Sequence, residues 1–162
     1  MQFVSPSKGQ LELEEVLRDI TLFINEDKRF LYRLIIGTDS QVSRQVDFVN
    51  AIVIHRKGRG ARYFWRRVTR EYKTPLSLKA RMFTEASLSV ELAIEVLELL
   101  QKALAGAFIE IAPHMEVHID IGNKGPTRDM IKELVGFVRG SGFEAKIKPE
   151  AYAASTVADK YT

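Results

Sequence analysis

The sequence contains no cysteine, and this absence removes several classes of function at once. Disulfide bonds, thiolate metal sites and cysteine nucleophiles are all excluded. Apolar runs long enough to span a bilayer are also missing, and no signal-peptide pattern opens the chain. A serine nucleophile is not indicated either, because Ser40 has no recognisable His–Asp companions. We therefore expect a cytoplasmic protein with no membrane partner.

The chain has 162 residues, which is enough for one domain with a proper hydrophobic core. Its fractions of hydrophobic residues, 46%, and charged residues, 28%, are those of a globular protein. There is no internal repeat, linker or low-complexity segment, so we expect a single domain over residues 1–162. Residues 1–29 would form an N-terminal helical extension, and residues 30–162 would form the core.

The net charge of +3 hides a basic segment between Arg56 and Lys73. This segment holds eight basic residues and a single acid, so it carries +7 while the rest of the chain sums to −4. Such a band favours a polyanionic partner, here nucleic acid. Alternatively, the segment is a strand with one face in the core and a solvated basic edge, and Trp65 fits either arrangement. The candidate nucleic-acid-binding residues are Arg56, Lys57, Arg59, Arg62, Arg66, Arg67, Arg70 and Lys73.

Hydrophobic periodicity predicts a leading helix, three strands, and then helices that alternate with strands. Strands are expected at residues 30–38, 46–56, 61–72, 115–121 and 143–148. Helices are expected at residues 11–25, 78–105, 125–139 and 155–159, the last with Ser155 as its N-cap. The turn signal at residues 58–60 indicates that the first three strands form an antiparallel meander. This order is typical of an α/β domain.

Two aspartates lie near the ends of expected strands. Asp39 follows the apolar run at residues 34–36, and Asp120 shares the polar face of its strand with Glu116 and His118. Sheets of α/β proteins place ligands at such strand ends, so the two aspartates are a reasonable pair. Taken singly, either aspartate is also compatible with a turn or a capping role.

Two further carboxylates lie in helices. On a helical wheel Glu85 falls on the apolar face of the helix at residues 78–105, whereas the other glutamates of that helix fall on the opposite side. Alternatively, Glu85 pairs with Lys79 or Arg81. Asp159 lies in the short last helix, where an aspartate in the first turn also favours the helix dipole.

Clustered carboxylates repel one another unless cations hold them together. Oxygen ligands without cysteine suit Mg²⁺ or Mn²⁺ rather than Zn²⁺. Two such ions about 3.5–4 Å apart can activate a water and stabilise the leaving oxygen of a phosphodiester. We therefore expect two divalent cations, Mg²⁺ or Mn²⁺, bound by Asp39, Glu85, Asp120 and Asp159. His118 is a possible auxiliary residue for proton transfer or for orienting a carboxylate.

With these positions the chain resembles the ribonuclease H-like superfamily, and more closely the YkuK-type family of bacterial ribonuclease H-like proteins. The resemblance is carried by Ser5-Pro6-Ser7-Lys8-Gly9, Leu34-Ile35-Ile36-Gly37-Thr38-Asp39-Ser40-Gln41 and Ala154-Ser155-Thr156-Val157-Ala158-Asp159-Lys160. It implies a five-stranded mixed sheet, with three antiparallel strands and then two parallel additions, flanked by helices and preceded by an extra N-terminal helix. It also implies that the catalytic residues and metal ligands are Asp39, Glu85, Asp120 and Asp159.

Two functions are compatible with this resemblance. The first is a nuclease that cuts phosphodiester bonds of RNA, DNA or a hybrid by a two-metal mechanism, leaving a 5′-phosphate and a 3′-hydroxyl. The second is a non-catalytic nucleic-acid-binding module that retains the fold. A degenerate module should have lost at least one acidic position, and all four are present here, which favours the enzyme.

Overall fold

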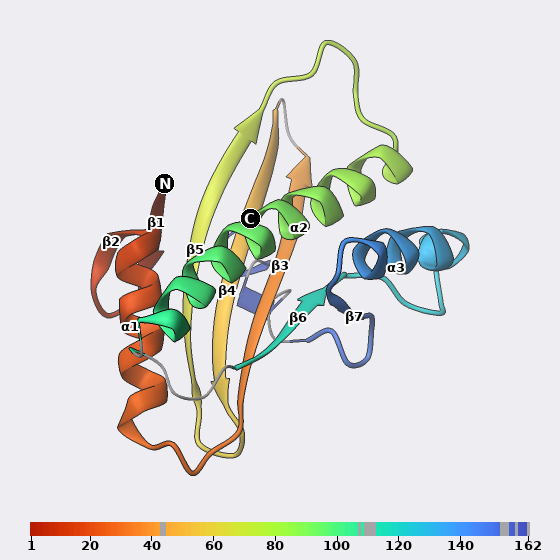
Figure 1. The fold of residues 1–162 in the computed structure, drawn as a ribbon. Helices are drawn as coiled ribbons and strands as arrows, with labels where there is room; N and C mark the ends of the chain where they lie inside the picture. Colours follow the sequence, from red (N-terminus) through yellow and green to blue (C-terminus); the bar gives the residue numbers. More distant parts are fainter. Residues whose placement is uncertain (43–44, 107, 109–112, 153–155, 158, 162) are drawn as a thin grey trace.

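The computed structural model describes residues 1–42, 45–106, 108, 113–152, 156–157 and 159–161. Its strands form one sheet in the order β2-β1-β5-β4-β3-β6-β7, with helices packed against it (Figure 1). The strands are β1 (Gln2–Ser5), β2 (Gly9–Glu12), β3 (Tyr32–Val42), β4 (Val46–Arg56), β5 (Ala61–Arg70), β6 (His114–His118) and β7 (Glu144–Lys146). The helices are α1 (Leu13–Glu26), α2 (Leu78–Ala105) and α3 (Ile131–Gly140), with the 3-10 turn η1 (Arg128–Met130) before α3. In these ranges no helix is long and apolar enough to cross a membrane.

The centre of the sheet is the antiparallel meander β3-β4-β5, which the alternating branched and aromatic residues predict. Strand β6 pairs parallel with β3, and β7 pairs parallel with β6. Helix α2 lies between β5 and β6 in the chain, and α3 lies between β6 and β7. The expected α/β class and the mixed arrangement of these strands are confirmed.

The expected count of five strands is wrong, because β1 and β2 add a hairpin to one edge and bring the sheet to seven strands. The two strands pair with each other, and Val4 of β1 pairs with Trp65 of β5. The turn between them ends at Gly9, whose φ of +74° suits glycine. Each strand has only four residues, too few for alternation to be distinguished from a loop. The N-terminal residues therefore contribute strands as well as α1.

The helices also differ from the prediction, because four were expected and the described residues form three α-helices. The helix expected from residue 125 begins only at Arg128, as η1, since Gly125 has a φ of +86° and Pro126 lacks an amide hydrogen. The expected N-cap Ser155 lies outside the described residues. Residues 156, 157 and 159 have helical backbone but belong to none of the three α-helices.

The two faces of the sheet bury different partners. The helical face packs against α1, α2 and α3 and holds the main core, which includes Leu34 and Ile36 of β3. The opposite face, called here the C-terminal face, holds a smaller cluster that includes Ile35, with Val157 and Tyr161 packed against it. Successive side chains of a strand point to opposite faces, so Asp39 belongs to the C-terminal face.

Helix α2 brings one acid to the helical face. The helix begins after Ser77, whose side chain accepts a hydrogen bond of 3.1 Å from Ala80 N. Glu85 is only 3% exposed, whereas Glu91 and Glu98 are exposed. The prediction that Glu85 points inward from the apolar side of α2 is confirmed.

A buried ladder of hydrogen bonds ties α2 to three strands. Thr38 Oγ1 lies 2.8 Å from Ser89 Oγ of α2, and Asn50 Nδ2 donates to Thr38 Oγ1 at 2.6 Å. Arg66 Nε then donates to Asn50 Oδ1 at 2.9 Å. Ser89 also donates to the backbone oxygen of Glu85 at 2.9 Å. The ladder therefore fixes the turn of α2 that carries Glu85 against the sheet.

We predict that Asn50→Ala lowers the free energy of unfolding by about 2–4 kcal/mol, because it leaves Thr38 and Arg66 without their partner in a buried place. Urea denaturation followed by circular dichroism measures the change. Thr69→Ala removes an exposed hydrogen bond to Asp47 and serves as the control, with an expected loss below about 1 kcal/mol. Equal losses in the two variants would contradict a stabilising role for the ladder.

Candidate active site

Asp39 and Asp120 occupy equivalent places on neighbouring parallel strands. The pairing of β3 with β6 ends where Gly37 lies opposite His118, and the next positions on that face are Asp39 and Asp120. Beyond this point Ile119 N donates to the backbone oxygen of residue 146 at 2.9 Å, so the chain after β6 turns toward β7. The expectation that the two aspartates lie near each other at strand ends agrees with this register.

Glu85 reaches the same place from α2. Ser40 Oγ donates a hydrogen bond of 2.5 Å to Glu85 Oε1. Burial raises the pKa of Glu85 to about 8, against the hydrogen bond from Ser40, and the negative charges of Asp39 and Asp120 also raise it. Glu85 therefore lies within electrostatic range of both aspartates.

Asp159 joins this group from the C-terminal segment through a hydrogen bond with the Asp39 carboxyl. Two carboxyl groups can form such a bond only while one of them keeps its proton. The pKa of Asp39 is raised to about 7, first by burial, then by the hydrogen bond and charge of Asp159 and by the charge of Asp120. The backbone N–H of Ser40 opposes this rise. Asp39 thus interacts with each of the other three predicted carboxylates, and Glu85 interacts with Asp39 and Asp120.

The C-terminal segment is held against the sheet by aromatic contacts next to Asp159. The ring of Tyr161 stacks on Trp65 with 4.1 Å between centroids and 13° between planes. The hydroxyls of Tyr161 and Tyr63 lie 3.1 Å apart, and Arg67 Nη2 donates to the backbone oxygen of Tyr161 at 2.6 Å. Trp65 therefore serves to position this segment, and it does so from within the basic segment.

Asp120 has a counter-ion that comes from the solvent side. Lys148 Nζ lies 2.5 Å from Asp120 Oδ1, and the Lys148 side chain is 56% exposed. The contact is an ion pair without hydrogen-bond alignment, since this buried oxygen has no hydrogen-bond partner among the residues that the structure describes. Contact with Asp120 raises the pKa of Lys148, and the charges of Asp159 and Asp39 add to the rise.

The chemistry of this donor set fits a hard divalent cation. Every candidate ligand atom in the group is a carboxylate oxygen, the donor type that Mg²⁺ and Mn²⁺ prefer. The ammonium of Lys148 supplies positive charge where the carboxylates crowd, and the raised pKa of Asp39 favours its neutral form there. Asp120 Oδ1 is buried and its one described partner is the ammonium of Lys148, which a metal ion on this oxygen would replace.

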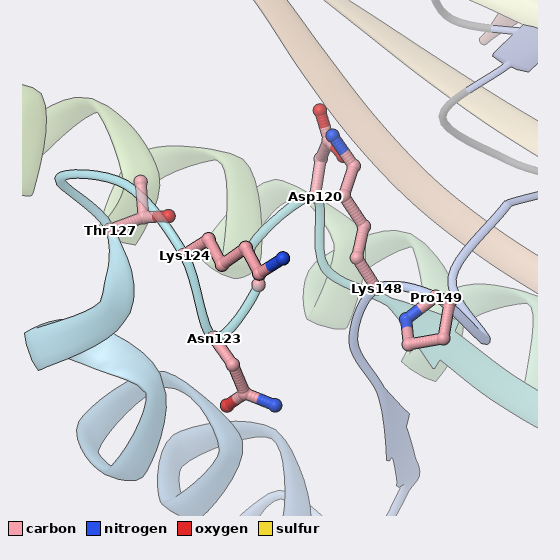
Figure 2. Close-up of a pocket in the computed structure, with 7 residues that line it drawn as sticks. Asp120, Asn123, Lys124, Thr127, Lys148 and Pro149 are labelled. Atoms are coloured by element: carbon pink, nitrogen blue, oxygen red, sulfur yellow. The ribbon is translucent and has the colours of Figure 1, made fainter.

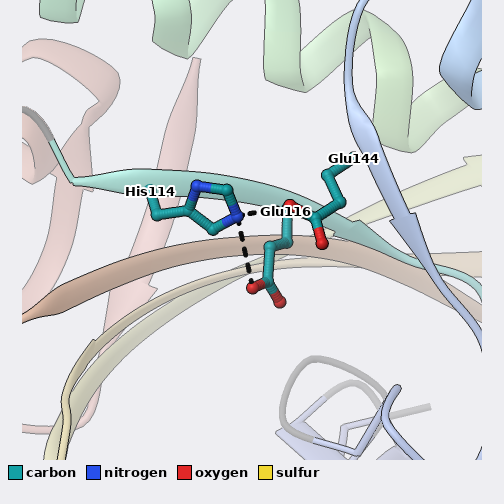
Figure 3. Close-up of side chains that lie close together, drawn as sticks. All are labelled: His114, Glu116 and Glu144. Atoms are coloured by element: carbon teal, nitrogen blue, oxygen red, sulfur yellow. Dashed lines mark hydrogen bonds and ion pairs between the residues drawn. The ribbon is translucent and has the colours of Figure 1, made fainter.

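A second group of possible metal ligands was not identified from the sequence. His114, Glu116 and Glu144 each offer one ligand atom, and these atoms lie within 4.8 Å of one another (Figure 3). His114 Nε2 contacts Glu144 Oε2 and lies 3.7 Å from Glu116 Oε1. Alternation along β6 indicates that His114 and Glu116 share a face. Glu144 joins them only because β7 pairs with β6 so that Glu144 lies opposite Glu116, and the sequence alone does not reveal this pairing.

His118, the possible auxiliary residue, is directed toward this second group. Its Nε2 lies 3.0 Å from Glu116 Oε2, and both side chains are nearly fully buried. Burial lowers the pKa of His118, against the effect of Glu116, so the neutral imidazole is favoured. Arg33 Nη1 lies 3.6 Å from Glu116 Oε1 and supplies a lasting positive charge. Glu116 is thereby compensated inside the protein.

The basic segment divides into two sets. Arg56 Nη2 lies 2.9 Å from Glu26 Oε2, and Arg62 contacts both Asp19 and Glu26, so these two arginines bind α1 to the sheet. Arg66 is held in the buried ladder. The members with exposed side chains are Lys57, Arg59, Arg67, Arg70 and Lys73.

Comparison with known proteins gives matches over nearly the whole chain. A family model described as Ribonuclease H-like matches residues 15–162. The chain is also 36% identical over 171 residues to "Uncharacterized protein YkuK" of Bacillus subtilis (strain 168), covering 99% of this chain and 96% of that protein. No solved structure gives a significant match.

We predict that the protein in EDTA loses stability as the pH rises from about 4 to about 8. The folded-state pKa values of Asp39 and Glu85, about 7 and about 8, lie above the ordinary values of 3.8 and 4.5. The folded protein therefore binds more protons than the unfolded chain in this window, and deprotonation favours unfolding. We expect a total loss of roughly 2–5 kcal/mol in urea denaturation. Mg²⁺ or Mn²⁺ at the upper end should restore most of it, and a flat profile would contradict the prediction.

Asp39→Asn is expected to raise the free energy of unfolding in EDTA at about pH 8 by roughly 1–2 kcal/mol, because it removes a charge that Asp120 and Asp159 repel. The matched control is Asp47→Asn on β4, whose carboxylate accepts a hydrogen bond from Thr69 and lies outside the cluster. This variant should be neutral or slightly destabilised. Strong destabilisation by Asp39→Asn would show that the carboxylates do not strain the metal-free fold.

Proposed function

Because this chain belongs to the ribonuclease H-like family, as a member of the YkuK type, we propose that it is a divalent-metal-dependent nuclease. The family supports a role connected with nucleic acid. In our proposal that role is the hydrolysis of phosphodiester bonds in RNA, DNA or a hybrid. The protein would act as a single ribonuclease H-like domain, with residues 1–29 as its N-terminal extension.

The observation that carries the proposal is the convergence of four carboxylates from separate segments. Asp39 comes from β3, Glu85 from α2, Asp120 from the chain after β6, and Asp159 from the C-terminal segment. Burial, and then their proximity, raise the pKa values of Asp39 and Glu85, and this opposes folding at neutral pH. Residues with strongly perturbed pKa values cluster at functional sites, where function requires an arrangement that lowers stability.

In this proposal the four carboxylates hold two divalent cations, Mg²⁺ or Mn²⁺. When bound, the cations lower the pKa of water and stabilise the charge that develops on the leaving oxygen. Asp39 gives up the proton that it shares with Asp159 and becomes available as a ligand. Ser40 holds the Glu85 carboxylate in a fixed orientation through its hydrogen bond.

The exposed basic residues supply contacts for the phosphate backbone. Arg67 is aligned with Asp39 across β4, because Val49 pairs with both of them, so it lies on the same face and at the same level. Arg70 lies three residues further along β5 and is exposed, but alternation places it on the helical face. The cation of Arg67 can hold a nucleic acid over the C-terminal face, and binding should weaken with salt.

The test is an incubation of the pure protein with labelled single-stranded, duplex, hybrid and branched substrates in Mn²⁺, Mg²⁺ or EDTA. We expect metal-dependent cutting that leaves a 5′-phosphate, and a loss of about a hundredfold or more in Asp39→Asn. Asp47→Asn should cut like the wild-type protein. Binding without cutting in either metal would contradict the nuclease proposal and favour a non-catalytic recognition module.

A further inference from the structure

A cavity of about 480 Å³ lies beside the carboxylates and shares Asp120 with them (Figure 2). Its volume falls in the range of sites for small ligands, and most of its lining residues carry a polar or charged group. The lining residues are Asp120, Gly122, Asn123, Lys124, Thr127, Lys148 and Pro149. Apart from Asp120, the polar side chains are two ammonium groups, an amide and a hydroxyl. All of these can donate hydrogen bonds, so the cavity has the chemistry of an anion site.

We propose that this cavity binds a phosphate group of the nucleic-acid substrate close to the bond that is cut, with Lys148 and Lys124 as its cationic partners. The inference rests on the proposed function, because the phosphate is placed by the polynucleotide that the carboxylates cut. Asp120 joins the two places, since it lines the cavity and belongs to the carboxylate group.

Lys148 is positioned to change partners. Its ammonium lies 2.5 Å from Asp120 Oδ1, and more than half of its side chain is exposed. With a divalent cation held by Asp120, the Lys148 ammonium would be repelled from this oxygen. Lys148 then extends into the cavity that it already lines, where a phosphate can pair with it. The four-carbon stem of lysine allows this movement without a change in the backbone.

Lys124 approaches the cavity from the loop that follows Asp120, and Figure 2 shows its side chain on the opposite wall from Lys148. The loop backbone lies close to the stem of Lys148. A Cβ added at Gly122 would lie 3.4 Å from Lys148 Cβ, which is the limit of ordinary contact. Gly125, with a φ of +86°, lets the loop turn back toward Thr127. The two lysines are therefore held across one cavity.

The alternative is that Lys148 serves only as the counter-ion of Asp120. Lys148→Gln separates the two roles, because glutamine keeps the size and polarity of the side chain without its charge. Lys124→Gln removes the second cation without touching Asp120. Lys102→Gln, in the exposed last turn of α2 and outside the cavity lining, is the matched control.

The experiment measures fluorescence anisotropy of labelled oligonucleotides that carry either a 5′-phosphate or a 5′-hydroxyl, in Ca²⁺ and in EDTA. Ca²⁺ takes the same oxygen ligands as Mg²⁺, and gel electrophoresis checks that the oligonucleotides stay intact. In Ca²⁺ we expect Lys148→Gln and Lys124→Gln each to weaken binding about fivefold to tenfold, the effect of one charge-assisted contact. The slope of log affinity against log salt should fall by about 0.7–0.9 for each lysine. In EDTA, where Lys148 is paired with Asp120, Lys148→Gln should change little.

The two oligonucleotide ends distinguish the source of the phosphate. If the 5′-phosphate tightens binding to the wild-type protein and not to Lys148→Gln, the cavity takes a terminal phosphate. If Lys148→Gln weakens the binding of the 5′-phosphate and the 5′-hydroxyl oligonucleotide equally, the cavity takes an internal phosphate. Either result supports the proposal. The proposal would be overturned if Lys148→Gln and Lys124→Gln both bound as tightly as Lys102→Gln. It would also be overturned if the wild-type protein bound no oligonucleotide. Wild-type binding that depends on Lys148, without cutting in any metal, would refute the nuclease and leave the phosphate site standing.

Discussion

The pairing of β3 with the parallel strand β6 ends just before Asp39 and Asp120, which lie on the same face of the sheet. The candidate site depends on how the negative charge of these carboxylates is compensated. A buried carboxylate without a partner costs several kcal/mol, so each one needs compensation. Asp39 forms a hydrogen bond with Asp159 and has a raised pKa, Glu85 accepts a hydrogen bond from the Ser40 hydroxyl, and Asp120 faces the ammonium of Lys148. These are three compensations of different kinds, and in the proposed function each is given up to a divalent cation.

The rest of the fold brings these groups into range from both faces of the sheet. On the helical face the ladder from Ser89 to Arg66 fixes α2, so the position of Glu85 does not rest on apolar packing alone. On the C-terminal face the stacking of Tyr161 on Trp65 fixes the segment that carries Asp159. Neither contact touches the carboxylates, yet both decide how close the carboxylates come. Charged groups that repel one another need such rigid supports.

The parts that could be predicted from the sequence are those governed by local periodicity. The wheel of α2 identifies Glu85 because 28 residues give a clear apolar face, and β4 has the predicted bounds because its apolar residues are continuous. The hairpin of β1 and β2 is too short for such a signal. Lys148 and Glu144 could not be identified as site residues from the sequence, because the residues that they contact, Asp120 and His114, are distant in sequence. The arginines of the basic segment show the same limit, since only the fold separates Arg56 and Arg62 from the exposed set.

The contrast between Glu116 and Asp120 on one chain segment indicates why they can serve different purposes. The two residues share a face and are four positions apart, but the charge of Glu116 is balanced by the guanidinium of Arg33, and His118 adds a buried contact. A guanidinium keeps its proton at any physiological pH, so this balance is permanent. Asp120 is balanced by Lys148, which reaches it from the solvent and can leave. An internal counter-ion makes a carboxylate part of the core, whereas an exchangeable one keeps it available to a metal ion. In our proposal the nature of the counter-ion, rather than burial alone, distinguishes Glu116 as a structural carboxylate from Asp120 as a ligand.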